Sequence, residues 1–383
     1  MMLALVSCGK SENSGDNAGI VTDASGYTGS VENYKIGDFD AELISYLCLN
    51  GYEKSDFAVS PTALRAALGI AAASSQSSTR TELLSAAGFS SIDSVNSWYS
   101  GIKDPKAFSV ESSVWGNTDL MAPFTESYTA NIKESYNVDA KTCTSDEVTS
   151  LINDWLGQKT NGTVQDAGED LDGLAAVMVS TVRLQAAWKD MFSEASSIEG
   201  VFFGMSGDGT TMEFMDRTGE YLYAEESGTK ILAIPMEGGL SFVCFIGSRT
   251  DMFDKMTSLK TEKVHVVLPK FEIESVFDVR DFSGFLLSRG VRDATDEKKA
   301  NFYNMCAGSD WFIQEIVQRI KISTDEKGIG SAAENTKADA NSVGAGAEVQ
   351  QFAANEPFSF AIFSGLGTSS QHMLIYGQMM NGN

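Results

Sequence analysis

The segment from Thr324 to Phe352 constrains the fold of this chain more than any other feature. It reads TDEKGIGSAAENTKADANSVGAGAEVQQF and consists mostly of small and polar residues. Apolar, strand-like runs flank it, WFIQEIVQRIKIST before and FSFAIFS after. Loops longer than about 15 residues without secondary structure of their own are uncommon in compact domains, where they are functional or disordered. The segment is therefore either the working part of this protein or an unstructured insertion.

The same segment contains a GxGxxA pattern, formed by Gly328, Gly330 and Ala333, which is typical of dinucleotide-binding loops. Such a loop must open a helix whose apolar face packs against a sheet. The residues after Ala333 contain almost no large apolar side chain before Val349, so a helix here would have no face to bury. We therefore interpret the pattern as part of a loop and expect no nucleotide cofactor.

Composition excludes several classes of function. The chain has 28 Lys and Arg against 52 Asp and Glu, a formal net charge of −24, which opposes binding to nucleic acid. The two histidines, His265 and His372, lie far apart in sequence, and none of the five cysteines forms a CxxC pair. The histidines and cysteines that a catalytic triad or a zinc site needs are therefore too few and too scattered, and we expect neither an enzyme nor a metal protein.

The N-terminus suggests a membrane anchor. Cys8 ends the apolar run LALVSC, and a polar stretch rich in Ser, Gly, Asn and Asp follows it. This arrangement resembles the lipobox of bacterial lipoproteins, although the apolar run is short and lacks a basic start. The resemblance implies a signal remnant at 1–8, lipidation of Cys8, a flexible tether at 9–33 and a location in the bacterial cell envelope, facing the periplasm or the cell surface. The alternative is a disordered leader, and without its anchor the protein would be extracellular.

From Tyr34 onward, helical and strand patterns alternate. Ser60 and Pro61 form a favourable helix start, and a second helix is predicted within EVTSLINDWLGQKTNG. The run KVHVVLPKFEIESV is strand-like, with Pro269 indicating an edge or a bulge. Helices cluster early and strands late, which favours an α+β fold. The expected core faces are Leu64, Ala67, Leu68 and Ala71 in the first helix, Leu151, Ile152, Trp155 and Leu156 in the second, and the terminal strands FSFAIFS and HMLIYGQMM.

At the long loop the sequence resembles the serpins, a superfamily of serine and cysteine protease inhibitors. In that family a strand runs into a Glu-Glu-Gly-type turn, a hinge of small residues and an exposed reactive-centre loop. In this chain the turn corresponds to Glu326, Lys327 and Gly328. The hinge implied by the resemblance comprises Glu326, Gly328, Ile329, Gly330, Ser331, Ala332 and Ala333.

Further motifs occur in serpin order and cover about residues 34 to 381. They are FAVSPTALRAAL, STRTELL, INDWLGQKTNGTV, LQAAWKDMF, VVLPKFEIES and FAANEPFSFAI. The resemblance implies one serpin domain at 34–383, with three β-sheets, eight or nine helices and a reactive-centre loop at about 328–351. It also implies a monomer without cofactors.

The resemblance further implies a mechanism. A serine or cysteine protease attacks the loop, and the freed hinge inserts into the central sheet while carrying the covalently attached protease away. Counting about fifteen residues from Gly328 places the reactive bond between Ser342 and Val343. Side chains near this bond are small or neutral, which favours an elastase-like, subtilisin-like or papain-like partner over a trypsin-like one.

Two departures from the family leave an alternative open. In the implied sheet-opening region, which comprises Ser60, Pro61, Ser180 and Gln318, the chain has Ser180, Ala63 and Gln318 where the family often has Asn, Ser and His. Alternation along an inserted strand would point Lys337 and Asp339 inward, where unpaired charges are costly. Together with Glu334 in the hinge, these charges favour a non-inhibitory serpin that binds other molecules and whose loop is cleaved as plain substrate.

Overall fold

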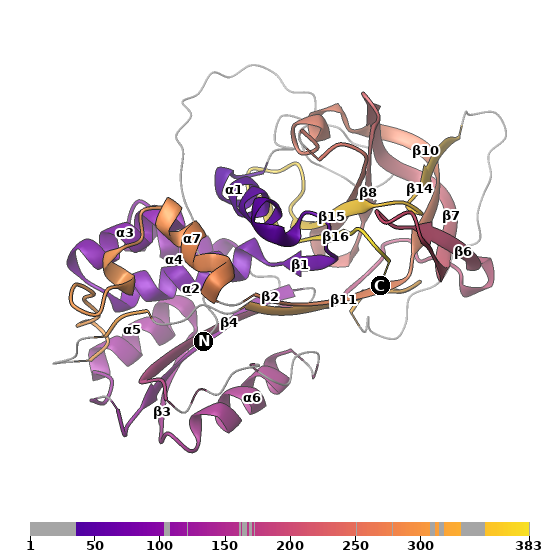
Figure 1. The fold of residues 1–383 in the computed structure, drawn as a ribbon. Coiled ribbons are helices and arrows are strands. Elements are labelled where there is room, and N and C mark those ends of the chain that lie inside the picture. Colours follow the sequence, from indigo (N-terminus) through magenta and orange to yellow (C-terminus); the bar gives the residue numbers. More distant parts are fainter. Residues whose placement is uncertain are drawn as a thin grey trace.

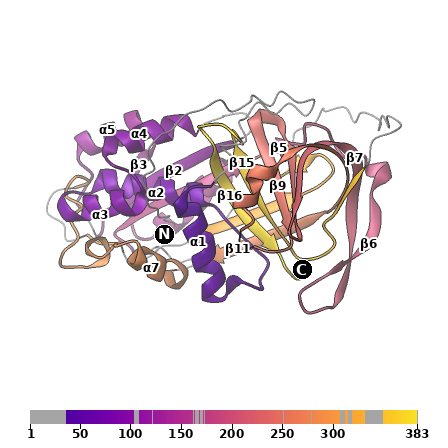
Figure 2. The same ribbon diagram turned by 90° about the horizontal axis from the view of Figure 1, so that it is seen from above.

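Helices gather at one end of the molecule and most strands at the other (Figures 1 and 2). The structure is a computed structural model that describes residues 36–382, apart from 103–107, 121, 161, 163–166, 168–170, 172, 250, 278, 307–310, 314–317 and 331–348. Its α-helices are α1 (Asp38–Leu47), α2 (Pro61–Ser74), α3 (Ser77–Ala87), α4 (Ile92–Gly101), α5 (Glu126–Tyr136), α6 (Val148–Lys159) and α7 (Val279–Ser288).

The largest sheet has nine strands. Its order is β1 (Phe57–Val59), β16 (His372–Met379), β15 (Phe358–Ser364), β9 (Leu240–Ile246), β8 (Thr229–Pro235), β7 (Gly209–Glu226), β10 (Lys260–Pro269) and β14 (Gln350–Ala353), with β6 (Ile198–Phe203) paired to β7. The terminal strands β15 and β16 lie inside this sheet, and every residue of β15 is buried. The prediction of two buried strands at the end of the chain is therefore confirmed.

Two smaller sheets meet at a single residue. One has the order β3 (Asp139–Cys143), β2 (Phe108–Asn117) and β4 (Ala176–Leu184), and the other β11 (Phe271–Phe277), β12 (Gln318–Thr324), β13 (Gly328–Ile329) and β5 (Ala186–Ala187). Strands β4 and β5 are consecutive and separated only by Gln185. The two sheets therefore share one continuous backbone.

The expected α+β architecture with three sheets is confirmed, and three details differ. The described ranges contain seven α-helices, because the remaining helical segments, such as Asp254–Ser258, are single turns. Leu151, predicted to share the buried face of α6, is 38% exposed, whereas Ile152, Trp155 and Leu156 are buried. Pro269 is the last residue of β10 and lies past the pairing with β14, so of the two predicted features, an edge or a bulge, the bulge is absent there.

Helix α2 is the centre of the helical end. Ser60 caps it, because its hydroxyl accepts a hydrogen bond from the amide of Ala63 at 3.1 Å, and Pro61 occupies the first turn. Nearly every residue of α2 is buried, so the helix is apolar on all sides, as expected for a helix enclosed by its neighbours. A Cβ atom at Gly69 would lie 2.7 Å from a methyl group of Val95, so this glycine permits the close approach of α4.

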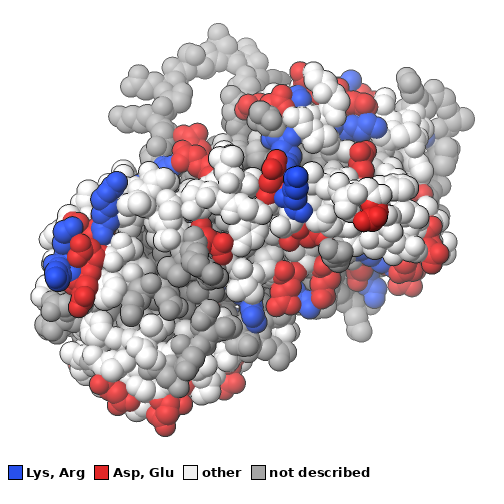
Figure 3. Space-filling model, in the orientation of Figure 1, with Lys and Arg blue, Asp and Glu red and all other residues white. Residues whose placement is uncertain are grey.

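Acidic side chains are spread over much of the face shown in Figure 3, and Lys and Arg form only small groups there. This distribution follows from the formal net charge of −24. Among the residues described, no helix is both long and apolar enough to cross a bilayer.

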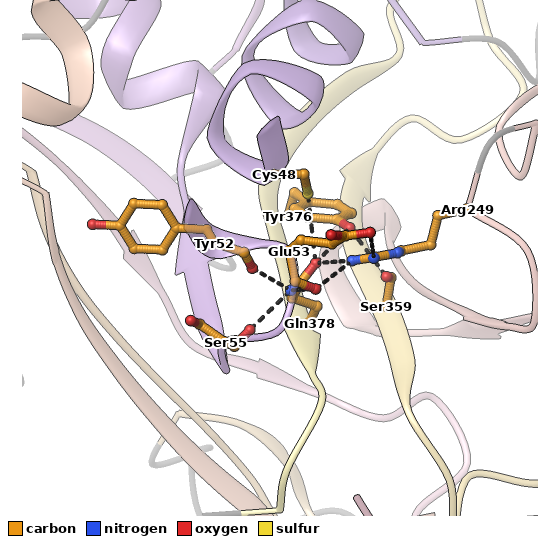
Figure 4. A network of polar contacts seen from close by, with 8 residues as sticks. All are labelled: Cys48, Tyr52, Glu53, Ser55, Arg249, Ser359, Tyr376 and Gln378. Carbon is orange, nitrogen blue, oxygen red and sulfur yellow. Dashed lines mark hydrogen bonds and ion pairs between the residues drawn. The ribbon is translucent and has the colours of Figure 1, made fainter. Parts of the chain in front are cut away.

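A buried glutamine ties α1 to the largest sheet (Figure 4). The side-chain amide of Gln378, fully buried in β16, donates to the carbonyl oxygens of Tyr52 and Ser55, both at 2.8 Å, and of Glu53 at 3.2 Å. Its oxygen accepts a hydrogen bond from Arg249 at 2.9 Å. The connection from α1 to β1 contains an irregular turn at Cys48–Tyr52, and Gln378 donates to carbonyl groups at the end of this turn and just after it.

Candidate functional site

A four-residue turn reverses the chain between β12 and β13. The amide of Asp325 donates to the carbonyl oxygen of Gly328 at 3.0 Å, and the amide of Gly328 donates back at 3.2 Å. The Asp325 carboxylate also accepts from the amides of Lys327 and Gly328, which is the local pattern that favours Asp in turns. Gly328 has φ +157°, and a Cβ atom there would lie 2.0 Å from the carbonyl oxygen of Ala186. Only glycine fits this position.

The turn delivers β13 between two strands. Ile329 pairs with Thr324 of β12 on one side and with Ala186 of β5 on the other. The Ile329 side chain is 1% exposed, so it points into the core. The amide of Gly330 then donates to the carbonyl oxygen of Ser323 at 3.0 Å. The hinge is therefore already hydrogen-bonded as a short strand where it leaves the described residues.

The strands that continue past β13 belong to two different sheets. Strand β4 ends one sheet, and β12 belongs to the other. Within the part of the chain that the structure describes, no ladder joins β4 to β12. Strand β13 therefore lies between β12 on one side and β5, which follows β4 in the chain, on the other.

Glu326 is the buried anchor of the turn. Its carboxylate accepts a hydrogen bond from Ser197 at 2.5 Å and lies 2.6 Å from the ammonium group of Lys270, which also pairs with Glu213 at 3.0 Å. Burial opposes ionisation of Glu326, but the hydrogen bonds from Lys270 and Ser197 outweigh it, so the pKa of this carboxyl lies below its ordinary value. The hydrogen bond to Glu326 likewise raises the pKa of Lys270. The pair therefore stays charged near neutral pH.

The segment after β5 holds the turn through its backbone. The amide of Trp188 donates to the carbonyl oxygen of Lys327 at 2.9 Å, and its indole donates to that of Asp325 at 2.8 Å. The amide of Phe192 donates to the carbonyl oxygen of Glu326 at 3.0 Å. Three consecutive carbonyl groups of the turn are thus fixed by one segment.

The residues of the implied sheet-opening region form hydrogen bonds to α2 and β2. The Gln318 side chain accepts from the amide of Ser60 at 2.7 Å and donates to its carbonyl oxygen at 3.1 Å. The Ser60 hydroxyl donates to the carbonyl oxygen of Leu374 at 2.7 Å. Ser180 lies apart from this group and shares a hydrogen bond with Ser112 at 2.7 Å. The structure therefore brings Ser60, Pro61 and Gln318 together and places Ser180 on the facing strand β4.

At its other end, the loop segment is followed by the edge strand β14. This strand pairs in parallel with β10, from Val264↔Gln350 to Val267↔Ala353. His265 of β10 reinforces the pairing, because its ring nitrogens lie 2.9 Å from the side-chain oxygen of Gln351 and 2.9 Å from a carboxylate oxygen of Asp216. His372, the other histidine, lies against Trp98, and burial lowers its pKa to about 4.

Several predicted site residues lie outside the described residues, namely Cys8, Ser331, Ala332, Ala333, Ser342 and Val343. Sequence reasoning did not identify Ser197 or Ser112, and it did not predict that Trp188 donates hydrogen bonds to the turn. Lys270 and Trp188 stood within serpin motifs, so their positions carried a signal. Nothing in the local sequence around Ser197 indicated its contact with Glu326, from which it is separated by 129 residues.

Replacing Lys270 by Met should lower the stability of the fold strongly. The substitution leaves Glu326 buried without its cation, and removing one partner of a buried pair typically costs about 3 kcal/mol or more. The urea midpoint at pH 7 should fall clearly. The matched control is Lys321→Met, which breaks a more exposed pair with Glu272 and should cost no more than about 1 kcal/mol. Equal effects of the two substitutions would contradict this account.

The pairing of β14 should weaken as pH rises. Burial disfavours charging of His265, but its hydrogen bonds with Gln351 and Asp216 outweigh burial and raise its pKa above the ordinary value. A raised pKa adds stability below the pKa of the unfolded chain, about 6.5, and this stability is lost as pH rises through the pKa of the folded state. The urea midpoint of the wild type should therefore fall between pH 5.5 and pH 8. The midpoint of His265→Gln should fall less over the same range. Parallel pH profiles for the two proteins would rule out this role.

Comparisons with known proteins agree with this geometry. The family model "Serpin (serine protease inhibitor)" matches residues 35–382. An uncharacterized serpin-like protein of Thermococcus kodakarensis is 27% identical over 67% of this chain, and the match spans 62% of that relative's length. Serine proteinase inhibitor 1 of Myxoma virus is 27% identical over 64% of this chain and 69% of its own.

Solved serpin structures share the fold. Tengpin, a thermophilic serpin in its native state, has a TM-score of 0.75 at 23% identity and covers 89% of this chain and 92% of its own. Human thyroxine-binding globulin in complex with thyroxine has a TM-score of 0.76 at 16% identity and covers 92% and 98%. The family match extends over nearly all of the sequence, and this chain belongs to the serpin family.

Proposed function

We propose that this serpin inhibits a serine or cysteine endopeptidase by suicide. The protease attacks the segment 331–348 and forms an acyl-enzyme, and the upstream half of the cut segment then continues β13 as a strand between β4 and β12. The observation that carries the proposal is the pairing of Ile329 with both Thr324 and Ala186. The first residues of the hinge are already in place, so insertion can extend an existing strand rather than nucleate a new one.

The proposal also names a class of target. Residues 341–344 around the proposed bond Ser342–Val343 are small or neutral. A trypsin-like pocket requires Arg or Lys, and the basic residue in this segment, Lys337, lies too close to the hinge to leave a long strand for insertion. We therefore favour elastase-like, subtilisin-like or papain-like enzymes.

A panel of proteases tests this function. Incubation with elastase or subtilisin should produce a covalent complex that survives a denaturing gel, and incubation with trypsin should not. Mass spectrometry should find a released C-terminal peptide that begins at Val343, give or take one residue. A trypsin complex with cleavage after Lys337 would falsify this placement of the reactive bond.

One observation favours the alternative, a serpin cleaved as plain substrate that acts by binding. If the strand register of β13 is continued, Asn335 falls between Ser180 of β4 and Gln318 of β12. Two residues later, Lys337 falls beside Met178, which is buried and apolar. An inward-pointing ammonium group there would oppose complete insertion. Thyroxine-binding globulin, which has the same fold, is solved with thyroxine bound, so the fold alone does not require inhibition.

Cleavage near Ser342 should raise the melting temperature by tens of degrees if the strand inserts. Insertion would add on the order of ten ladder hydrogen bonds at about 1 kcal/mol each. Because Lys337 opposes insertion, cleaved Lys337→Thr should melt at a higher temperature than cleaved wild type, whereas the two intact proteins should melt alike. An unchanged melting temperature after clean cleavage of both proteins would support the alternative.

We also propose that Cys8 carries a lipid that anchors the protein in a bacterial cell envelope. The support is the sequence LALVSC followed by a polar tether. In a bacterial host expressing the full leader, Cys8→Ala should move the protein from the membrane fraction to the soluble fraction. Equal partitioning of Cys8→Ala and wild type would exclude this anchor.

A further inference from the structure

A cavity of about 920 Å³ lies between α1 and the segment that follows β9, and we call it the α1 cavity. Small-molecule sites typically measure about 300–1,000 Å³, so this cavity has the size of one. Its floor is apolar, because Ile44, Met252 and Tyr376 line it and are almost completely buried. The ring of Phe253 stands beside that of Tyr376, with 6.2 Å between centroids. Leu49, which also lines the cavity, is 85% exposed.

The charged side chains that line the α1 cavity are mostly acidic. Four carboxylates line it against one cation, Arg249: Asp38, Glu53, Asp251 and Asp254. Arg249 is already engaged, because it donates two hydrogen bonds, both at 2.9 Å, and pairs with Glu53 at 3.5 Å (Figure 4). An anionic ligand would therefore meet four carboxylates and a cation that already has its partners.

Two of these carboxylates have no counter-ion. Asp251 pairs with Lys255 at 3.0 Å, but within the described residues no cation pairs with Asp38 or Asp254. Each stands at the start of a helical segment, where the exposed amide groups favour a carboxylate. That effect explains why each is tolerated singly, but it leaves both charges unneutralised beside one cavity. The net charge of −24 makes the potential there more negative still.

We infer that the α1 cavity binds a small organic cation, an amine or a quaternary ammonium with an apolar body. The apolar body covers the recessed floor and the exposed side chain of Leu49, which removes apolar surface from water. The cationic group neutralises Asp38 and Asp254. Aromatic rings attract cations as well as apolar groups, so Phe253 and Tyr376 suit both parts of such a ligand.

Benzyltrimethylammonium is a suitable probe, because it carries its charge at every pH. Its counterparts are benzyl alcohol, which is neutral, and phenylacetate, which is anionic. Calorimetry with the full chain at low salt should give saturable binding of the cation with a dissociation constant of about 1 mM or lower. The two counterparts should bind at least about tenfold more weakly. Equal affinity for either counterpart, or no saturable binding of the cation, would overturn the inference.

Cys48 reports where the probe binds. Its thiol lines the α1 cavity and is half-buried, whereas the described cysteines Cys143, Cys244 and Cys306 are buried. Burial raises the pKa of Cys48, so its alkylation by iodoacetamide is followed at alkaline pH by peptide mass spectrometry. Saturating probe should slow this alkylation. Binding that leaves the rate unchanged would place the probe elsewhere and would contradict the inference.

A pair of variants with equal net charge tests the two unpaired carboxylates. Asp38→Asn with Asp254→Asn should weaken binding of the cation about tenfold, because both changes remove charge at the cavity. The matched control is Glu134→Gln with Asp208→Asn, which removes two exposed carboxylates that do not line the cavity. Its affinity should stay within about twofold of wild type, since only the long-range field changes.

All four substituted side chains are exposed, so both variants should fold, and their melting temperatures without probe check this. An equal loss of affinity in the two variants would show a response to net charge alone. That result, or wild-type affinity in Asp38→Asn with Asp254→Asn, would refute the assignment of a cation site to the α1 cavity.

Discussion

The ion pair between the buried Glu326 and the partly buried Lys270 fixes the point on which the geometry of the hinge depends. Lys270 is the single residue between β10 and β11, so the pair joins the largest sheet, the sheet of β12 and the turn before β13 at one place. Ser197 adds the start of β6 to the same carboxylate. A buried carboxylate is tolerated only when its lone pairs are satisfied, and here a cation and a hydroxyl satisfy them. The turn therefore has one stable position relative to the strands around it.

This fixed turn explains why the hinge sequence is so restricted. Gly328 passes within 2.0 Å of the Ala186 carbonyl oxygen, measured from where its Cβ would lie, and Gly330 within 2.8 Å of that of Leu184. Both glycines also have positive φ, which disfavours other residues. Ile329, between them, points into the core, and its burial stabilises the position of β13. The three residues combine two backbone constraints with one apolar anchor.

Sequence alone predicted the elements that depend on local patterns. The start of α2 at Ser60 and Pro61 follows from capping, and burial of β15 and β16 follows from continuous apolar runs. Leu151 was misjudged because the helical period places it at the border of the buried face, where neighbouring elements decide exposure. The contacts of Glu326 with Ser197 and of Trp188 with Asp325 join residues more than a hundred positions apart. No local pattern encodes such contacts, and the motif positions of Trp188 and Lys270 indicated importance without naming a partner.

The register of β13 connects the hinge to the sheet-opening region. Continued along β4 and β12, it places Asn335 between Ser180 and Gln318, two buried polar residues on facing strands. In the structure, Ser180 is satisfied by Ser112, and Gln318 by the backbone of Ser60. An incoming Asn335 would add a donor and an acceptor on the inward face, at a position where its neighbours on both strands are polar. The same register gives Lys337 no such neighbour on β4, because Met178 stands there. Insertion beyond Asn335 gains ladder hydrogen bonds but desolvates the ammonium group of Lys337. The balance between these two free energies sets how far the strand inserts, and a strand that stops early leaves a substrate rather than an inhibitor.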